Sequence, residues 1–233
     1  MYKRERQSKK RATATQTELD VSGCGLRELD ISLYPDLRYL NCSDNQLTTL
    51  DLAGASELRV LQCFNNHLTA LDLSVQSLLQ DLYCSHNALV RLDLTHTPQL
   101  KRLWCYNNHL TSLELSNIGS LIELLCYNNH LTELDLSPVT GLQMLSCRAN
   151  QLTALDVSVT PDLEILYCSD NRLTQLDISV TPKLEALYCY GNQLTKLDLG
   201  SLTALEVLYC YNNLLVDVDA TGLPKLRLLR WRE

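Results

Sequence analysis

Leucines and cysteines return at fixed positions along most of this chain. In one stretch Leu37, Leu40 and Cys42 follow the order L-x-x-L-x-C, and the same order begins again 21 residues later. Around the second leucine the apolar positions alternate with a period of two, which is typical of a short strand with one face toward the core. The pattern therefore predicts one short strand in every 21 residues.

The period is strict through nine repeats. Nine cysteines stand 21 residues apart, and an asparagine follows each of them by three residues, from Asn45 to Asn213. These cysteines are Cys42, Cys63, Cys84, Cys105, Cys126, Cys147, Cys168, Cys189 and Cys210. A unit of this length cannot bury its own apolar edge, so it must pack against its neighbours. We therefore expect one domain with a continuous core and a parallel sheet of about eleven strands.

The second half of each unit reads L-T-x-L-D-L-S followed by four variable residues, which is too short for an ordinary helix of about 11 residues. Five of the six prolines share one position just before the first leucine of the next unit. These are Pro35, Pro98, Pro161, Pro182 and Pro224. Because proline fixes φ and stops a helix, we predict extended or single-turn segments opposite the sheet.

The full consensus L-x-x-L-x-C-x-x-N-x-L-T-x-L-D-L-S resembles the leucine-rich repeat, and its cysteine resembles the cysteine-ladder type of internalin J and related bacterial surface proteins. The resemblance implies an α/β-type leucine-rich-repeat solenoid, a right-handed curved coil with a concave parallel sheet and short, mostly non-helical convex segments. It covers residues 16–233. These divide into a partial first coil at 16–36, nine full repeats at 37–225 and a partial last coil at 226–233, where Trp231 is expected to cover the core.

Charge is distributed unevenly along the chain. Residues 1–12 hold six basic residues and Glu5, a net charge of +5, which leaves about −12 for the rest of a chain whose total is −7. We expect residues 1–15 to be a basic, poorly ordered tail. The acidic body would repel phosphates, so nucleic acid is not an expected partner.

Membrane insertion is not expected, because no apolar run approaches the roughly 18 to 20 residues of a membrane-spanning helix. No apolar segment follows the basic residues, as it would in a secretory signal peptide. The family resemblance nevertheless suggests a bacterial protein at the cell surface or secreted. An excised segment, an intracellular scaffold and an effector exported by another route all remain open.

The cysteines do not have the spacing of a metal site, because no C-x-x-C occurs. Neighbours in the cysteine column would lie one strand spacing apart, which exceeds the roughly 3.8 Å between the Cβ atoms of a disulfide. We interpret them as packed, reduced thiols. Cys42-Ser43-Asp44 and Cys168-Ser169-Asp170 resemble the cysteine-x-aspartate motif of bacterial leucine-rich-repeat ubiquitin ligases, but a buried thiol is inert. No catalytic residue, cofactor or enzymatic activity is predicted.

Two polar columns accompany the cysteines. The asparagines are expected to satisfy backbone groups of neighbouring turns. The acidic column, from Asp30 to Asp219, is expected to accept backbone amide hydrogens, with a hard cation such as calcium between carboxylates as the alternative. His109 and His130 share a position in adjacent coils, with His67 earlier in the same column. We interpret them as residues of an exposed edge, not as metal ligands.

The residues on either side of each cysteine position point outward on the concave face, and many of them are aromatic. The residues that we predict to bind a partner are Tyr83, Trp104, Tyr106, Tyr127, Tyr167, Tyr188, Tyr190, Tyr209 and Tyr211. Tyrosine and tryptophan supply large, rigid contact areas with a polar group at the end. The flanking Asn65, Asn107, Asn128 and Asn212 are expected to add hydrogen bonds at the rim.

Two functions are compatible with this face. One is a non-enzymatic module that binds a polypeptide partner, which the resemblance also implies, with host contact as one setting. The other is a glycan-binding surface adhesin that stacks the same rings on sugars. A third explanation needs no ligand at all, because tyrosine suits strands and repeat duplication would propagate it.

Overall fold

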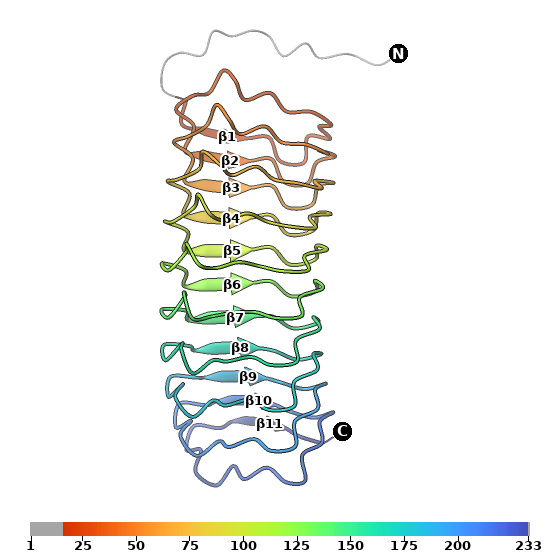
Figure 1. The fold of residues 1–233 in the computed structure, drawn as a ribbon, viewed down its shortest axis with the longest axis vertical. Helices are drawn as coiled ribbons and strands as arrows, with labels where there is room; N and C mark the ends of the chain where they lie inside the picture. Colours follow the sequence, from red (N-terminus) through yellow and green to blue (C-terminus); the bar gives the residue numbers. More distant parts are fainter. Residues whose placement is uncertain (1–15, 233) are drawn as a thin grey trace.

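Each repeat contributes one strand of three residues, and the strands lie side by side in sequence order (Figure 1). The computed structural model describes residues 16–232, so the predicted tail at 1–15 lies outside the described residues. The strands are β1 (Glu18–Asp20), β2 (Tyr39–Asn41), β3 (Val60–Gln62), β4 (Asp81–Tyr83), β5 (Arg102–Trp104), β6 (Glu123–Leu125), β7 (Met144–Ser146), β8 (Ile165–Tyr167), β9 (Ala186–Tyr188), β10 (Val207–Tyr209) and β11 (Leu228–Arg230).

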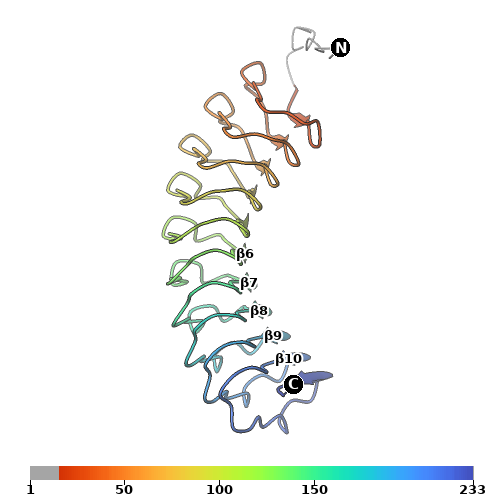
Figure 2. The same cartoon turned by 90° about the vertical axis from the view of Figure 1, so that its right-hand side faces the viewer.

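All eleven strands are parallel, and their register equals the sequence period. Leu19 pairs with Leu40, and the same pairing continues to Leu208 with Leu229, always 21 residues apart. Because the repeat length and the register agree, equivalent residues of every coil form straight columns across the sheet. Figure 2 shows the coil from the side as an arc, with the strands on its inner edge. The predicted concave parallel sheet is confirmed.

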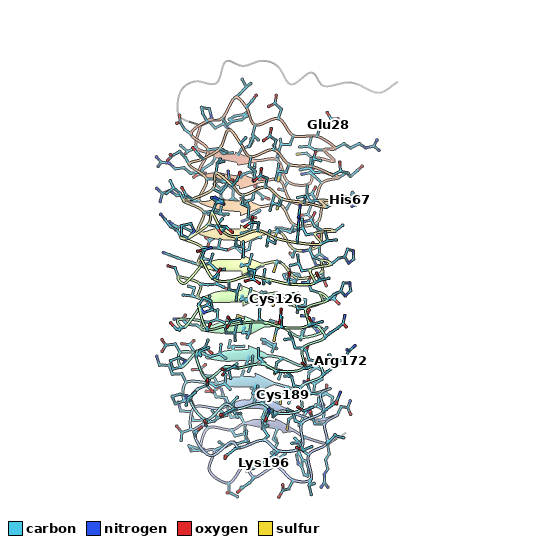
Figure 3. All side chains as sticks on the ribbon, in the orientation of Figure 1. Glu28, His67, Cys126, Arg172, Cys189 and Lys196 are labelled. Carbon is cyan, nitrogen blue, oxygen red and sulfur yellow. The ribbon has the colours of Figure 1, made fainter. Side chains whose placement is uncertain are left out.

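The core consists of leucine and cysteine columns enclosed by the coil. Leu124 and Cys126 on and beside β6 have no exposed surface, and the same holds for all nine periodic cysteines. In Figure 3 the labelled Cys126 and Cys189 lie within the outline of the coil, whereas His67 and Arg172 lie at its right-hand edge. Trp231 is half-buried against the last layer of the core, in the place predicted for it.

The convex side is built from tight turns. The peptide N–H of Leu37 donates to the carbonyl of Tyr34, which closes a turn around Pro35, and equivalent bonds recur in later coils. No helix occurs within residues 16–232. The predicted non-helical convex segments are therefore confirmed, and the helical part of the α/β class name has no counterpart in the described coils.

A left-handed backbone position recurs in every coil, two residues after each cysteine position. The residues there have φ between 51° and 65° and are Gly23, Asp44, Asn65, His86, Asn107, Asn128, Ala149, Asp170, Gly191 and Asn212. Glycine, asparagine and aspartate tolerate this conformation best, and most of the column consists of them. The column turns the chain out of each strand, and Ala149 is the residue least suited to it.

Gly191 and Ala149 should therefore respond to substitution in opposite ways. Gly191 has φ +65°, and a Cβ there would also crowd the Asp170 carboxylate, so Gly191→Ala should lower the free energy of unfolding by about 1–2 kcal/mol. Ala149 has φ 52°, which strains an alanine but not a glycine. Ala149→Gly should therefore raise the free energy of unfolding by about 0.5 kcal/mol, since the strain removed outweighs the added entropy of the unfolded chain. Urea denaturation measures both; effects of the same sign would show that strain does not govern this column.

Candidate functional site

The asparagine column holds the coils together and is not free to bind a ligand. The Nδ2 of Asn129 donates to the carbonyls of Cys105 and Cys126 at 3.1 and 3.0 Å, and its Oδ1 accepts the Leu110 peptide N–H at 3.0 Å. The same three contacts recur from Asn45 to Asn213. Each asparagine thus bonds backbone groups of its own coil and of the preceding coil, as predicted.

The cysteine column is buried and unreactive. Desolvation raises the pKa of Cys84 and Cys147 from the ordinary 9.0 to about 12. The thiols of Cys42 and Cys168, which belong to the two ligase-like motifs, are also fully buried with raised pKa values. All ten cysteines are unpaired, and Cys24 alone among them is exposed. A thiol that stays protonated and inaccessible cannot act as a nucleophile.

The acidic column has its predicted role in the convex turns. The Oδ1 of Asp51 accepts the peptide N–H of Ala53 at 2.9 Å, and the same contact is made by Asp30, Asp72, Asp93, Asp135, Asp156, Asp177, Asp198 and Asp219. The rings of His109 and His130 stack at 5.7 Å. Within residues 16–232 no three histidine, cysteine, aspartate or glutamate residues are grouped to hold a metal ion.

The predicted binding residues form two separate aromatic clusters, not one continuous face. The middle cluster consists of Tyr83, Trp104, Tyr106 and Tyr127 on and beside β4 to β6. Tyr83 and Trp104 meet edge to face at 4.7 Å, and Tyr106 stacks on Tyr127 at 4.3 Å. All four side chains are half-buried, so each ring keeps part of its surface in contact with solvent.

Charged groups fix the middle cluster. The Nε1 of Trp104 donates to the Glu123 carboxylate at 2.8 Å. Arg102 forms a bidentate ion pair with Asp81, with distances of 2.8 and 2.7 Å, which raises the pKa of Arg102. Two parallel N–H···O bonds hold a guanidinium in one orientation. The cluster is therefore a pre-ordered surface, in which Glu123 holds Trp104 and the charges of Arg102 and Asp81 are paired with each other.

The C-terminal cluster consists of Tyr167, Tyr188, Tyr190, Tyr209 and Tyr211 on and beside β8 to β10. Tyr188 stacks between Tyr167 and Tyr209, with ring centroids 4.5 and 5.0 Å away, and Tyr190 stacks on Tyr211 at 4.7 Å. Burial raises the pKa of Tyr188. Tyr188 is thus stacked on both faces, and all five tyrosines are half-buried.

Small and charged residues separate the two clusters. Ser146 and Ser169 occupy aromatic columns at β7 and β8 and are both buried. The guanidinium of Arg148 lies 4.6 Å from the centroid of Tyr127 and so closes the end of the middle cluster. The division depends on Ser146, Ser169 and Arg148, which the prediction of an aromatic face did not take into account although the sequence contains them.

Three of the four predicted rim asparagines bond to the side chain of the preceding residue in their own left-handed column. Asn65 donates to the Asp44 carboxylate at 2.7 Å, Asn107 contacts the His86 ring at 2.9 Å, and Asn128 donates to Asn107. Their first role is thus to stabilise the left-handed column. The enrichment of asparagine, aspartate and glycine two residues after each cysteine position was the signal that could have revealed this column.

Comparison with known proteins supports the repeat assignment. A family profile described as leucine rich repeats (2 copies) matches residues 182–225. The functional domain of InlJ from Listeria monocytogenes, which includes a cysteine ladder, superposes with a TM-score of 0.85 at 33% identity. The alignment covers 93% of this chain and 54% of that chain, so this chain spans about half the length of the InlJ structure.

More distant structures share the coil. The ectodomain of the receptor kinase GASSHO1/SCHENGEN3 from Arabidopsis thaliana, in complex with CASPARIAN STRIP INTEGRITY FACTOR 2, is 27% identical over 78% of this chain and 25% of that chain, with a TM-score of 0.70. The TLR13–ssRNA13 complex is 19% identical over 86% and 37%, with a TM-score of 0.67, and shows the fold alone. A search of curated protein sequences gave no significant match.

The part of the chain that the structure describes has no helix long and apolar enough to cross a membrane. Its 21-residue register, parallel coil and buried cysteine column agree with the sequence consensus and with the InlJ comparison. The chain is a leucine-rich-repeat protein of the cysteine-ladder type.

Proposed function

We propose that this chain is a non-enzymatic interaction module whose concave aromatic face binds a polypeptide. The observation that carries the proposal is the pair of ordered, half-exposed aromatic clusters on the inner side of the coil. Partly exposed Tyr and Trp held in fixed positions lose little conformational entropy when a partner binds. The GASSHO1/SCHENGEN3 ectodomain, a leucine-rich-repeat structure solved as a complex, supports a binding role in general terms.

The geometry of the rings favours a polypeptide over a glycan. A sugar stacks on an open aromatic face, but the faces of Tyr188 are covered by Tyr167 and Tyr209. Half-buried tyrosines that combine an apolar ring with a hydroxyl suit the apolar side chains and backbone polar groups of a polypeptide instead. RNA is disfavoured by charge, since the body of the chain carries about −12.

The test is an affinity capture from host and bacterial lysates, run beside a glycan array and an RNA-binding assay. Wild type is compared with Trp104→Ala and Tyr188→Ala, one substitution in each cluster. The matched control is Tyr34→Ala, because Tyr34 is a half-buried tyrosine in a convex turn. Circular dichroism first establishes that every variant retains its fold.

We expect a polypeptide that is captured by wild type and by Tyr34→Ala, and is lost with both cluster variants. Capture that survives both cluster substitutions would refute the concave face as the binding surface. Loss of binding to a simple sugar from one ring substitution would instead establish the adhesin function.

A further inference from the structure

The residue immediately before each strand forms a column whose charge changes sign along the coil. Arg38, Arg59 and Lys101 lie toward the N-terminal end, and Glu164, Glu185 and Glu206 follow toward the C-terminal end, where Arg227 before β11 is the last member of the column. Gln80 falls within the basic part, and Ile122 and Gln143 separate the two parts. We refer to the first three as the basic segment and the last three as the acidic segment.

Like charges are direct neighbours within each segment. The peptide N–H of Arg59 donates to the carbonyl of Arg38 at 2.8 Å, and Glu185 donates in the same way to Glu164. Side chains of equal charge in adjacent strands repel one another, which costs folding free energy. The fold tolerates this repulsion, although a neutral residue would fit the exposed position equally well.

Within residues 16–232 most of the charged side chains of the two segments have no ion-pair partner. Arg38, Arg59, Lys101, Glu164 and Glu185 are exposed and form no ion pair, and Glu206 alone pairs with Arg227.

Nearby charges of opposite sign are mostly engaged elsewhere. Asp44 accepts from Asn65, Asp81 pairs with Arg102, and Lys183 pairs with Asp162 at 2.6 Å. Asp36 and Glu57 lie two residues before the two arginines and form no ion pair with them. The charge of each segment is therefore available to a ligand.

The acidic segment borders the C-terminal aromatic cluster. Between them on the same strands lie Ile165, Ala186 and Val207, so the sheet there has an apolar centre with carboxylates along one side. Lysine and arginine side chains match such a surface, because their stems cover apolar area while the cation reaches a carboxylate. The chain itself offers a precedent, since Arg230 lies 5.8 Å from the Tyr209 ring centroid.

We propose that the partner is a polypeptide with a basic stretch that lies on β8 to β10 and an acidic stretch that lies near β2, β3 and β5. This proposal rests on the proposed function and adds the chemistry and direction of the partner. The centres of the two segments are about six strand spacings apart, roughly 30 Å. An extended peptide covers that distance with about ten residues.

The probe is a synthetic peptide of about 14 residues, with a lysine block at one end, a glutamate block at the other and a photoreactive group at the lysine end. Cross-links are mapped by mass spectrometry at low salt, and affinity is measured by fluorescence anisotropy. The test variants are Glu164→Gln/Glu185→Gln and Arg38→Gln/Arg59→Gln. The control is Glu114→Gln/Glu133→Gln, which removes the same charge as the Glu164/Glu185 variant from exposed convex positions.

We expect cross-links on β8 to β10 and an affinity loss of about tenfold for each test variant, against less than twofold for the control. Cross-links scattered over the coil, or an equal loss from the convex control, would overturn the proposal. Either result leaves the Trp104→Ala and Tyr188→Ala capture test unaffected, so failure of this inference and failure of the proposed function are distinguishable.

Discussion

Between pH 9 and pH 10 the protein should lose most of its stability, because its core is lined with thiols. In the unfolded chain a thiol loses its proton near the ordinary pKa of 9.0, whereas burial holds Cys84 and Cys147 protonated to about 12. Stability is therefore complete below pH 9 and falls as the pH rises toward 12. Each thiol contributes a loss of about 1 kcal/mol between pH 9 and 10. Nine thiols together approach the entire stability of a typical domain, on the order of 10 kcal/mol.

Urea denaturation at pH 7, 8, 9 and 10, under reductant and without oxygen, measures this effect. The double variant Cys126→Ala/Cys147→Ala isolates the thiols from the tyrosines, which titrate in the same range. It should be less stable than wild type at pH 7, because of lost packing, yet lose about 2 kcal/mol less between pH 9 and 10. An identical pH dependence in both proteins would show that the cysteines do not determine alkaline stability.

Asn129→Ala should lower the free energy of unfolding by about 3 kcal/mol. The substitution leaves the buried peptide N–H of Leu110 without an acceptor and removes one of the two donors from the carbonyls of Cys105 and Cys126. The neighbouring Asn108 and Asn150 still donate to these carbonyls, which keeps the loss from being larger. The measurement is urea denaturation at pH 7.

Asn117→Ala is the matched control for this substitution. Asn117 is exposed in a convex turn, so its loss should change stability by less than about 0.5 kcal/mol. If Asn129→Ala unfolds at the same urea concentration as Asn117→Ala, the asparagine contacts do not stabilise the coil.

The framework could be predicted from the sequence because each of its columns is nearly invariant. A cysteine every 21 residues fixes the register, and that register places Leu124 and Cys126 inside the coil. Asparagine and aspartate have few ways to satisfy a backbone turn, so their roles also followed from residue type. One period thus determined strand order, burial and convex turns together.

The arrangement of the candidate site could be predicted only in part. The aromatic residues could be placed on one face, but their division into two clusters depends on three other residues. The small, buried Ser146 and Ser169 interrupt the aromatic columns, and Arg148 contacts the Tyr127 ring, a contact that the repeat period does not specify. The ion pair of Arg102 with Asp81 likewise depends on rotamers that a period does not specify. The arrangement of the candidate site is thus determined by the variable columns, where each side chain must be considered separately.

The central claim, that the concave aromatic face binds the partner, is tested most directly by hydroxyl-radical footprinting of the protein with its captured partner. Tyr106, Tyr188 and Tyr211 on the concave face should become protected in the complex, while the exposed convex residues Leu33 and Val180 should react as in the free protein. Protection of the convex residues, with the concave tyrosines unchanged, would contradict the account.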